Sequence, residues 1–221
     1  MTISTLSNRD FAAFLFDMDG TIVNSIEAVE RCWAAWAGRH GLDLATFLPT
    51  IHGVRGIEAI ARLQLPGIDP HAEARDVLLA EIEDMAGVRA IAGAAGFLAS
   101  LPEDRWAIVT SSPRELAIRR LAAARLPQPK VLVTGEDVER GKPAPDCFLL
   151  AARLLGRRIE DCLVFEDAPA GIEAAEAAGA SIVVVTATHR HRLATEHPSV
   201  LGYEVLAAQS LMDGGLRLGP A

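Results

Sequence analysis

The sequence predicts an α/β fold: a Rossmann-like, doubly wound parallel sheet with an inserted α-helical cap domain. Short apolar segments recur along the chain with helical segments between them, which is the pattern of an open parallel sheet. The interval from Ile22 to Ile91 shows helical periodicity, and it is far longer than the roughly dozen residues that a crossover between parallel strands needs. Chemically reactive side chains follow several of the apolar segments, at the edge where such sheets bind ligands.

Five segments have the short, apolar composition of buried parallel strands. They are Ala13–Asp17, Trp106–Thr110, Val131–Thr134, Cys162–Glu166 and Ser181–Thr186. A weaker sixth strand is expected near Tyr203–Leu206. The Gly-rich residues Asp213–Ala221 predict a loose tail.

The long interval after the first strand predicts helices over the ligand-binding edge of the sheet. From Ile26 to His40, apolar and aromatic residues recur at spacings of three and four, which gives one face of a helix. Further helical segments are expected at Ile57–Leu63 and Ala72–Met85. We therefore predict a cap domain of residues 23–91, inserted into a core domain of residues 1–22 and 92–221.

Composition limits the classes of partner. The 221 residues carry a formal net charge of −8, which argues against nucleic acid and anionic membrane surfaces. The three cysteines are widely spaced and predict free buried thiols in a reducing compartment. The polar segment Met1–Asp10 has no apolar signal region, and no apolar run is long enough to span a bilayer. We expect a cytoplasmic monomer.

Two carboxylates, Asp17 and Asp19, follow the first apolar segment one residue apart. Because side chains alternate along a strand, both leave its end on roughly the same side, and Gly20 allows the backbone to turn sharply. Their mutual repulsion is relieved by a divalent cation. The alternative interpretation is a strand that ends in an ordinary Asp-Gly turn.

Two later segments offer groups that suit a phosphoryl ligand. Thr110 and Ser111 supply a hydroxyl and small-residue amides at a strand end, although such a stretch is also a common helix cap. Lys142 lies in a proline-bounded turn before the next helix, and only it and Lys130 are lysines among the 21 basic residues. A compact ammonium there can bind phosphate and offset the charge of a nucleophile, whereas the alternative is a solvated turn lysine.

Glu166 and Asp167 end the fourth strand-like segment and precede an alanine-rich helix. They can serve simply as favourable charges at a helix N-terminus. If they face Asp17 and Asp19 across the sheet, they complete an all-oxygen site for magnesium.

Taken in order, these motifs resemble the haloacid dehalogenase superfamily of aspartate-based phosphatases, and the resemblance covers nearly the whole chain. Within that superfamily, the chain resembles the small sugar-phosphate and polyol-phosphate phosphatases that carry a helical cap. The segments behind the narrower match are Ala28–Arg31, Arg39–Leu42, Ile51–Gly53, Val109–Ser111 and Phe165–Gly171. The resemblance implies a Mg²⁺-dependent phosphatase of small phosphorylated metabolites that forms an aspartyl-phosphate.

The resemblance also implies roles for the motif residues. Asp17 would attack phosphorus, and Asp19 would protonate the leaving oxygen and then activate water. The phosphoryl oxygens would be clamped by Thr110 and Lys142, with help from amides near Asp19, Gly20 and Ser111.

The implied Mg²⁺ ligands are Asp17, the backbone carbonyl of Asp19 and Asp167, with Glu166 as a direct or an outer ligand. Asn24 departs from the pattern, because many relatives have aspartate there. We expect this difference to affect hydrogen bonds at the cap hinge rather than the chemistry.

The predicted cap supplies candidates for substrate selection. His52, Gly53 and Arg55 lie in a glycine-containing loop between helical segments, and their side chains can bind hydroxyls or a second anionic group. Arg114, just after the Thr110 strand, is a further candidate. The alternative is a helix-cap loop with exposed polar residues.

Rival activities are weighed on particular residues. A phosphonatase would need a cap lysine, and none lies between Ile22 and Ile91; a dehalogenase would lack Asp19. A β-phosphoglucomutase-like phosphosugar mutase is the main alternative, although such mutases commonly carry histidine near the position of Val29. The sequence does not favour a dinucleotide-binding oxidoreductase, because no GxGxxG motif follows the first strand. A catalytically inactive binding protein with the same fold would not need Asp17, Asp19, Thr110, Lys142 and Asp167 together.

Overall fold

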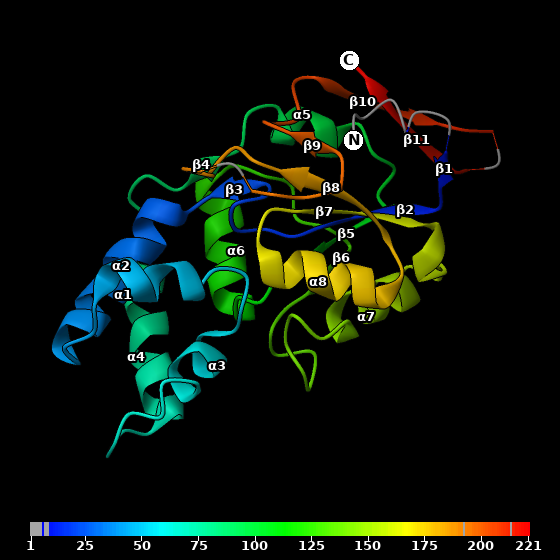
Figure 1. Cartoon of the computed structure of the whole chain (residues 1–221). Helices are drawn as coiled ribbons and strands as arrows, with labels where there is room; N and C mark the ends of the chain where they lie inside the picture. The colour runs from blue at the N-terminus through cyan, green and yellow to red at the C-terminus, as the bar shows by residue number, and fades with distance from the viewer. Residues whose placement is uncertain (1–5, 7–8, 192, 213) are drawn as a thin grey trace.

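A parallel sheet forms the centre of the fold. The computed structural model describes residues 6, 9–191, 193–212 and 214–221. In this part of the chain, six parallel strands lie in the order β6-β5-β2-β7-β8-β9 (Figure 1). They are β2 (Ala13–Phe16), β5 (Trp106–Val109), β6 (Val131–Val133), β7 (Cys162–Glu166), β8 (Ser181–Val185) and β9 (Ser199–Val200). Because the first strand lies in the middle and later strands add on both sides, the sheet is doubly wound, and the predicted fold class is confirmed.

Both faces of the sheet are covered. The helices are α5 (Ala94–Ala99) and α6 (Arg114–Ala123) on one face, and α7 (Asp146–Leu154) and α8 (Pro169–Ala178) on the other. In β2, Phe14 and Phe16 pack toward the first pair, and Ala13 and Leu15 pack toward the second. All four side chains are fully buried, which explains why this strand is a continuous apolar run.

A helical insert separates β2 from β5 along the chain. It contains α1 (Ile26–Arg39), α2 (Leu44–Phe47), the 3₁₀ turn η2 (Leu48–Thr50), α3 (Gly56–Ala61) and α4 (Pro70–Glu83). Trp33, Trp36, Phe47 and Ile60 belong to a hydrophobic cluster of its own. The three predicted helices are confirmed, whereas the division into a cap and a core domain stays a prediction.

The insert joins the core through a short antiparallel pair. Strand β3 (Val23–Asn24) leads into the insert, and β4 (Arg89–Ala90) leads out of it. Asn24 pairs with Arg89 there, so it lies where the insert begins.

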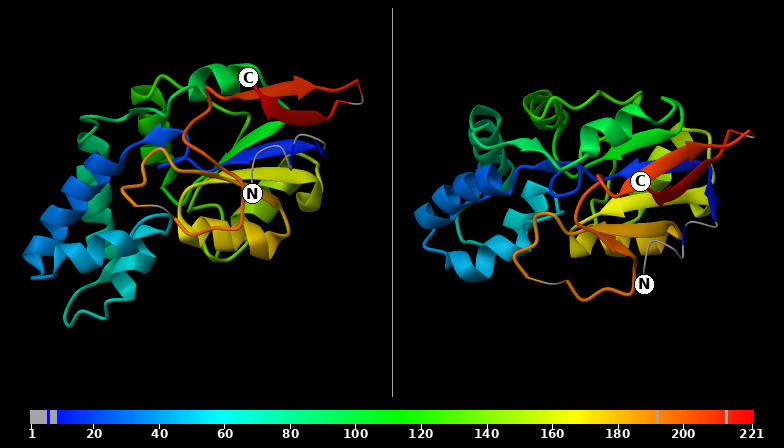
Figure 2. Two further views of the ribbon diagram at one scale, coloured as in Figure 1. Left: turned by 45° about the horizontal axis from the view of Figure 1, so that its top comes forward. Right: turned by 90° about the horizontal axis from the view of Figure 1, so that it is seen from above.

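The structure corrects both predictions for the end of the chain. The sixth parallel strand is β9, whereas Tyr203 packs in the core and Leu206 begins β10 (Leu206–Ser210) of a second sheet. The expected loose tail instead contains β11 (Leu216–Pro220), which pairs antiparallel with β10 and with β1 (Asp10–Phe11). Figure 2 shows this hairpin at the end of the molecule opposite the helical insert. Asp213, where the tail was expected to begin, lies outside the described residues.

Other sequence predictions concern the thiols and the membrane. Cys32, Cys147 and Cys162 are free and buried, as predicted. Among the helices of the described residues, none combines the length and apolar character that a membrane crossing requires. Most of the segment expected to carry no signal region (residues 1–5, 7 and 8) lies outside the described residues.

Burial of β11 makes its leucines part of the core. Leu216 is fully buried, so Leu216→Ala should lower the free energy of unfolding by about 2–5 kcal/mol, measured by urea denaturation. Leu201→Ala is the matched control, because Leu201 is 77% exposed and its loss should change stability by no more than about 0.5 kcal/mol. Equal effects of the two substitutions would contradict the assigned position of β11.

Candidate active site

A buried lysine connects the ends of three neighbouring strands. Lys142, in the loop before α7, is 1% exposed. Its Nζ donates to Asp17 Oδ1 after β2 (2.6 Å), to Glu166 Oε1 at the end of β7 (2.7 Å) and to the Val109 carbonyl at the end of β5 (3.3 Å). The alternative of a solvated turn lysine is therefore wrong.

The charged groups of this cluster shift one another's pKa values. Burial alone would lower the pKa of Lys142, but the attraction of Asp17 and Glu166 outweighs burial and raises it. Burial raises the pKa of Asp17 to about 7, against the opposing attraction of Lys142. The pKa of Asp167 is also raised, by burial and by the charges of Glu166 and Asp17. A site with this excess of buried carboxylates favours an added cation.

Glu166 is the anchor of the loop after β7. Its Oε2 accepts hydrogen bonds from the backbone N–H groups of Asp167 (2.6 Å) and Ala168 (2.7 Å). Gly171 is required beside it, because a Cβ at that position would lie 1.5 Å from Glu166 Oε1. Both carboxylate oxygens of Glu166 are thus engaged by protein groups.

Asp17, Glu166 and Asp167 form a buried acidic cluster, in which one oxygen of each lies within 4.8 Å of the others. Asp167 Oδ1 accepts a hydrogen bond from Thr21 Oγ1 (2.9 Å). Asp167 Oδ2 packs over Gly20, where a Cβ would lie 2.0 Å from it and where φ is +93°, so glycine meets both demands. Clustered carboxylate oxygens are the donor set that Mg²⁺ prefers, and these residues could hold such a metal.

Asp19 is not part of this cluster, and it lines a cavity. Its Oδ1 accepts a hydrogen bond from Ser25 Oγ (2.6 Å), and its Oδ2 accepts one from Ser112 Oγ (2.9 Å). The guanidinium of Arg120 lies 3.0 Å from the same Oδ2. Sequence analysis did not identify Ser25, Ser112 or Arg120.

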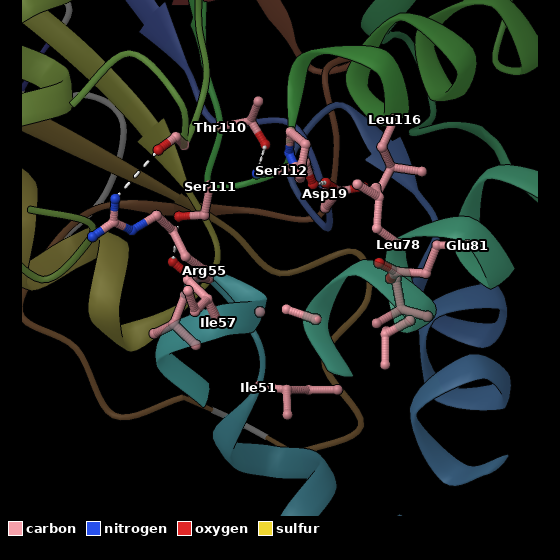
Figure 3. A pocket seen from close by; sticks show the side chains of 18 of the residues that line it. Asp19, Ile51, Arg55, Ile57, Leu78, Glu81, Thr110, Ser111, Ser112 and Leu116 are labelled. Carbon is pink, nitrogen blue, oxygen red and sulfur yellow. Dashed lines mark hydrogen bonds between the residues drawn. The ribbon is translucent and has the colours of Figure 1, made fainter. Parts of the chain in front are cut away.

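The cavity lies between the sheet edge and the helical insert and has a volume of about 340 Å³. Asp17, Asp19, Thr110 and Ser111 line it from the core. From the insert, apolar side chains and a few polar ones line it; they include Val29, Trp33, Ile51, His52, Ile57 and Leu78. Figure 3 shows Asp19 close to Ser112 at one end of this space and Ile51 at the other. Its size suits a small metabolite.

His52, Gly53 and Arg55 of the predicted cap loop all line the cavity, but their polar contacts differ. His52 lines the cavity, and burial lowers its pKa, so its imidazole is neutral at pH 7. Ser111 Oγ donates to the carbonyl of Gly53 (2.9 Å), which joins the loop to the core. The guanidinium of Arg55 binds Glu58 and the carbonyls of a core loop at residues 135, 138 and 139.

Thr110 lies with the other candidates, whereas Arg114 does not. Thr110 is buried beside Asp17's strand end, and its Oγ1 accepts from the backbone N–H of Ser112 (3.1 Å). Arg114 does not line the cavity; it binds Asp137 Oδ2 at 2.7 Å and is 44% exposed. The structure therefore gives no geometric support to Arg114 as a ligand residue.

His189 is a further residue that sequence analysis missed. Its Nε2 donates to the backbone carbonyl of Asp167 at 2.9 Å. Only its position three residues after the end of the strand-like segment Ser181–Thr186 pointed to this edge of the sheet.

Comparison with known proteins agrees with this geometry. Hexitol phosphatase A from Escherichia coli (strain K12) is 43% identical over 178 residues, which cover 79% of this chain and 82% of that protein. The 2-deoxyglucose-6-phosphate phosphatase 2 of Saccharomyces cerevisiae is 36% identical over 199 residues, covering 79% and 80%.

Solved structures give the same result. The structure of a hydrolase from Pseudomonas syringae has a TM-score of 0.72 and 27% identity, and the match covers 80% of this chain and 84% of that one. Residues 11–179 match the family described as haloacid dehalogenase-like hydrolases. The resemblance inferred from the motifs is confirmed, and the chain belongs to the haloacid dehalogenase-like hydrolase family.

Proposed function

We propose that this protein is a Mg²⁺-dependent phosphatase of small sugar or polyol phosphates. The observation that carries the proposal is the contact of buried Lys142 with both Asp17 and Glu166, beside Asp167 and next to a cavity that Asp17 lines. This arrangement supplies an oriented carboxylate and a fixed cation, which are the main demands of phosphoryl transfer.

Asp17 is the nucleophile. Its carboxylate forms a bond to phosphorus as the bond from phosphorus to the sugar oxygen breaks, and that oxygen takes a proton from Asp19. In the second step water attacks phosphorus and gives a proton to Asp19, which frees Asp17 and releases inorganic phosphate. Lys142 and Thr110, with backbone amides near Gly20 and Ser111, bind the phosphoryl oxygens.

Asp17, Asp167 and the backbone carbonyl of Asp19 would hold Mg²⁺. When bound, Mg²⁺ neutralises charge on the phosphoryl group and orients it. Glu166 acts behind these ligands, because it holds Lys142 and the Asp167 backbone by hydrogen bonds. The buried carboxylates of this chain thus fit the metal by their number, type and spacing.

The names of the relatives support the substrate class. Two of them are a hexitol phosphatase and a 2-deoxyglucose-6-phosphate phosphatase, and a third is glycerol-1-phosphate phosphohydrolase 2 of Saccharomyces cerevisiae. A cavity of about 340 Å³ between core and insert accommodates an alcohol of this size. We propose that residues 23–91 act as a cap over the site and that the protein works as a monomer.

Removal of the nucleophile should abolish the reaction. We expect Asp17→Asn to lower phosphate release from hexitol, deoxyglucose and glycerol phosphates by at least about 10⁴-fold, with an unchanged melting temperature. Asp104→Asn is the control, because the Asp104 side chain is 65% exposed and precedes the start of β5, whereas Lys142 contacts the other end of that strand. Substantial residual turnover by Asp17→Asn would refute the assignment, and interconversion of glucose phosphates without release would indicate a mutase.

Metal binding should depend on pH. Burial raises the pKa of Asp17 from 3.8 to about 7, so the metal-free folded protein holds a proton there more tightly than the unfolded chain does. The contribution of Asp17 to the stability of the metal-free protein therefore falls as the pH rises toward 7. Mg²⁺ requires the ionised carboxylate and competes with that proton. The rise in Tm on adding MgCl₂ should therefore be larger near about pH 8 than near about pH 5.5. A rise that is equal at both pH values, with NaCl of matched ionic strength as reference, would contradict this linkage.

His52 and Arg55 should differ in effect. His52 lines the cavity as a neutral imidazole, so His52→Ala should lower kcat/KM for the best sugar phosphate by about 3–10-fold and that for p-nitrophenyl phosphate by less than about 2-fold. Arg55 binds backbone carbonyls of the core, so Arg55→Ala should lower both values in parallel. A parallel loss in His52→Ala would show that this loop is structural.

A further inference from the structure

A buried arginine joins the helical insert to Asp19. Arg120 lies on α6, and 3% of its side chain is exposed. Its Nη1 lies 3.0 Å from Asp19 Oδ2 and 3.2 Å from Ser112 Oγ, whereas its Nη2 lies 2.9 Å from Glu81 Oε1 on α4. One guanidinium therefore contacts a carboxylate of the core at one end and a carboxylate of the insert at the other.

The hydrogen bonds of Asp19 distinguish its two oxygens. Oδ2 accepts from Ser112 and lies against Arg120, so both of its lone-pair directions are used. Oδ1 accepts from Ser25 and keeps one lone-pair direction. Oδ1 is thus the oxygen that is able to exchange a proton with the substrate.

A guanidinium suits this position for geometric reasons. Its planar fork presents Nη1 and Nη2 in fixed directions, so the contact with Glu81 also determines the direction from which Nη1 meets Asp19. A lysine ammonium is a single point charge and cannot contact both carboxylates in the same way. Glu81 is itself buried; burial raises its pKa, and Arg120 opposes that rise.

Building on the phosphatase function proposed above, we propose that Arg120 is a positioning residue that makes leaving-group protonation depend on the seated insert. Glu81 on α4 fixes the guanidinium, and the guanidinium together with Ser112 holds Asp19 so that Oδ1 points to the leaving oxygen. When the insert moves away, the contact with Glu81 is lost and Asp19 is held less firmly.

The dependence of the rate on the leaving group tests this proposal. An alkyl phosphate needs a proton on its leaving oxygen, whereas p-nitrophenyl phosphate expels a stable phenolate that needs none. The value of kcat/KM covers the steps up to formation of the aspartyl-phosphate, so it excludes the later role of Asp19 with water. We expect Arg120→Gln to lower kcat/KM by about 10–100-fold for the best alkyl phosphate and by less than about 3-fold for p-nitrophenyl phosphate.

Matched variants separate positioning from folding. Asp19→Asn is the positive control and should show the same selective loss, but a larger one. Arg120→Lys should be more active on the alkyl phosphate than Arg120→Gln is. If Arg120→Gln does not fold, Arg120→Lys takes its place in the comparison of the two substrates. Arg190→Gln breaks another ion pair between the core and the insert, that of Arg190 with Glu30 at 2.6 Å, and should leave the ratio of the two kcat/KM values unchanged.

The outcomes are distinct. Losses that are equal for both substrates in folded Arg120→Gln and Arg120→Lys, or an equally selective loss in Arg190→Gln, would overturn the positioning role. If the unmodified protein with Mg²⁺ releases no phosphate from any of the esters, that result would instead refute the phosphatase function itself.

Discussion

The position of Lys142 is the constraint on which the site depends. Its ammonium is buried where β2, β5 and β7 end, and it contacts an acceptor from each of them. An unpaired charge there would be strongly unfavourable, so the lysine requires Asp17 and Glu166 as much as they require it. The parallel sheet brings these strand ends to one edge, and the loop before α7 delivers the cation to them. Since the cluster holds more carboxylates than ammonium groups, it could hold a metal ion.

The helical insert completes the site from the other side. It has its own cluster of buried aromatic and aliphatic residues. Polar contacts join it to the core at several separate places, through Ser111 with Gly53, Arg55 with the loop at residues 135–139, and Arg120 with Glu81. The space left between the two parts is lined mainly by apolar side chains on the side of the insert and by Asp17, Asp19, Thr110 and Ser111 on the side of the core.

Much of the site could be predicted from the sequence because its residues are adjacent to strand ends, and an apolar run marks each end. Asp17, Thr110 and Glu166 were found in this way. Arg120 could not be, because it lies within a helix and 18 other arginines give no reason to select it. Its partner Glu81 is 39 residues away in sequence. Strand β11 was missed for a similar reason. Its alternating apolar pattern consists of only two residues, Leu216 and Leu218, in a segment rich in glycine.

The pairing of β1 with β11 has a consequence for biosynthesis. Asp10 lies opposite Arg217, and Phe11 lies opposite Leu216, so β1 pairs with a strand that is synthesised some two hundred residues after it. Until those residues emerge, the edge of β1 is open and the hydrophobic face beneath the hairpin is uncovered. During synthesis this edge is therefore open to association until β11 pairs with it.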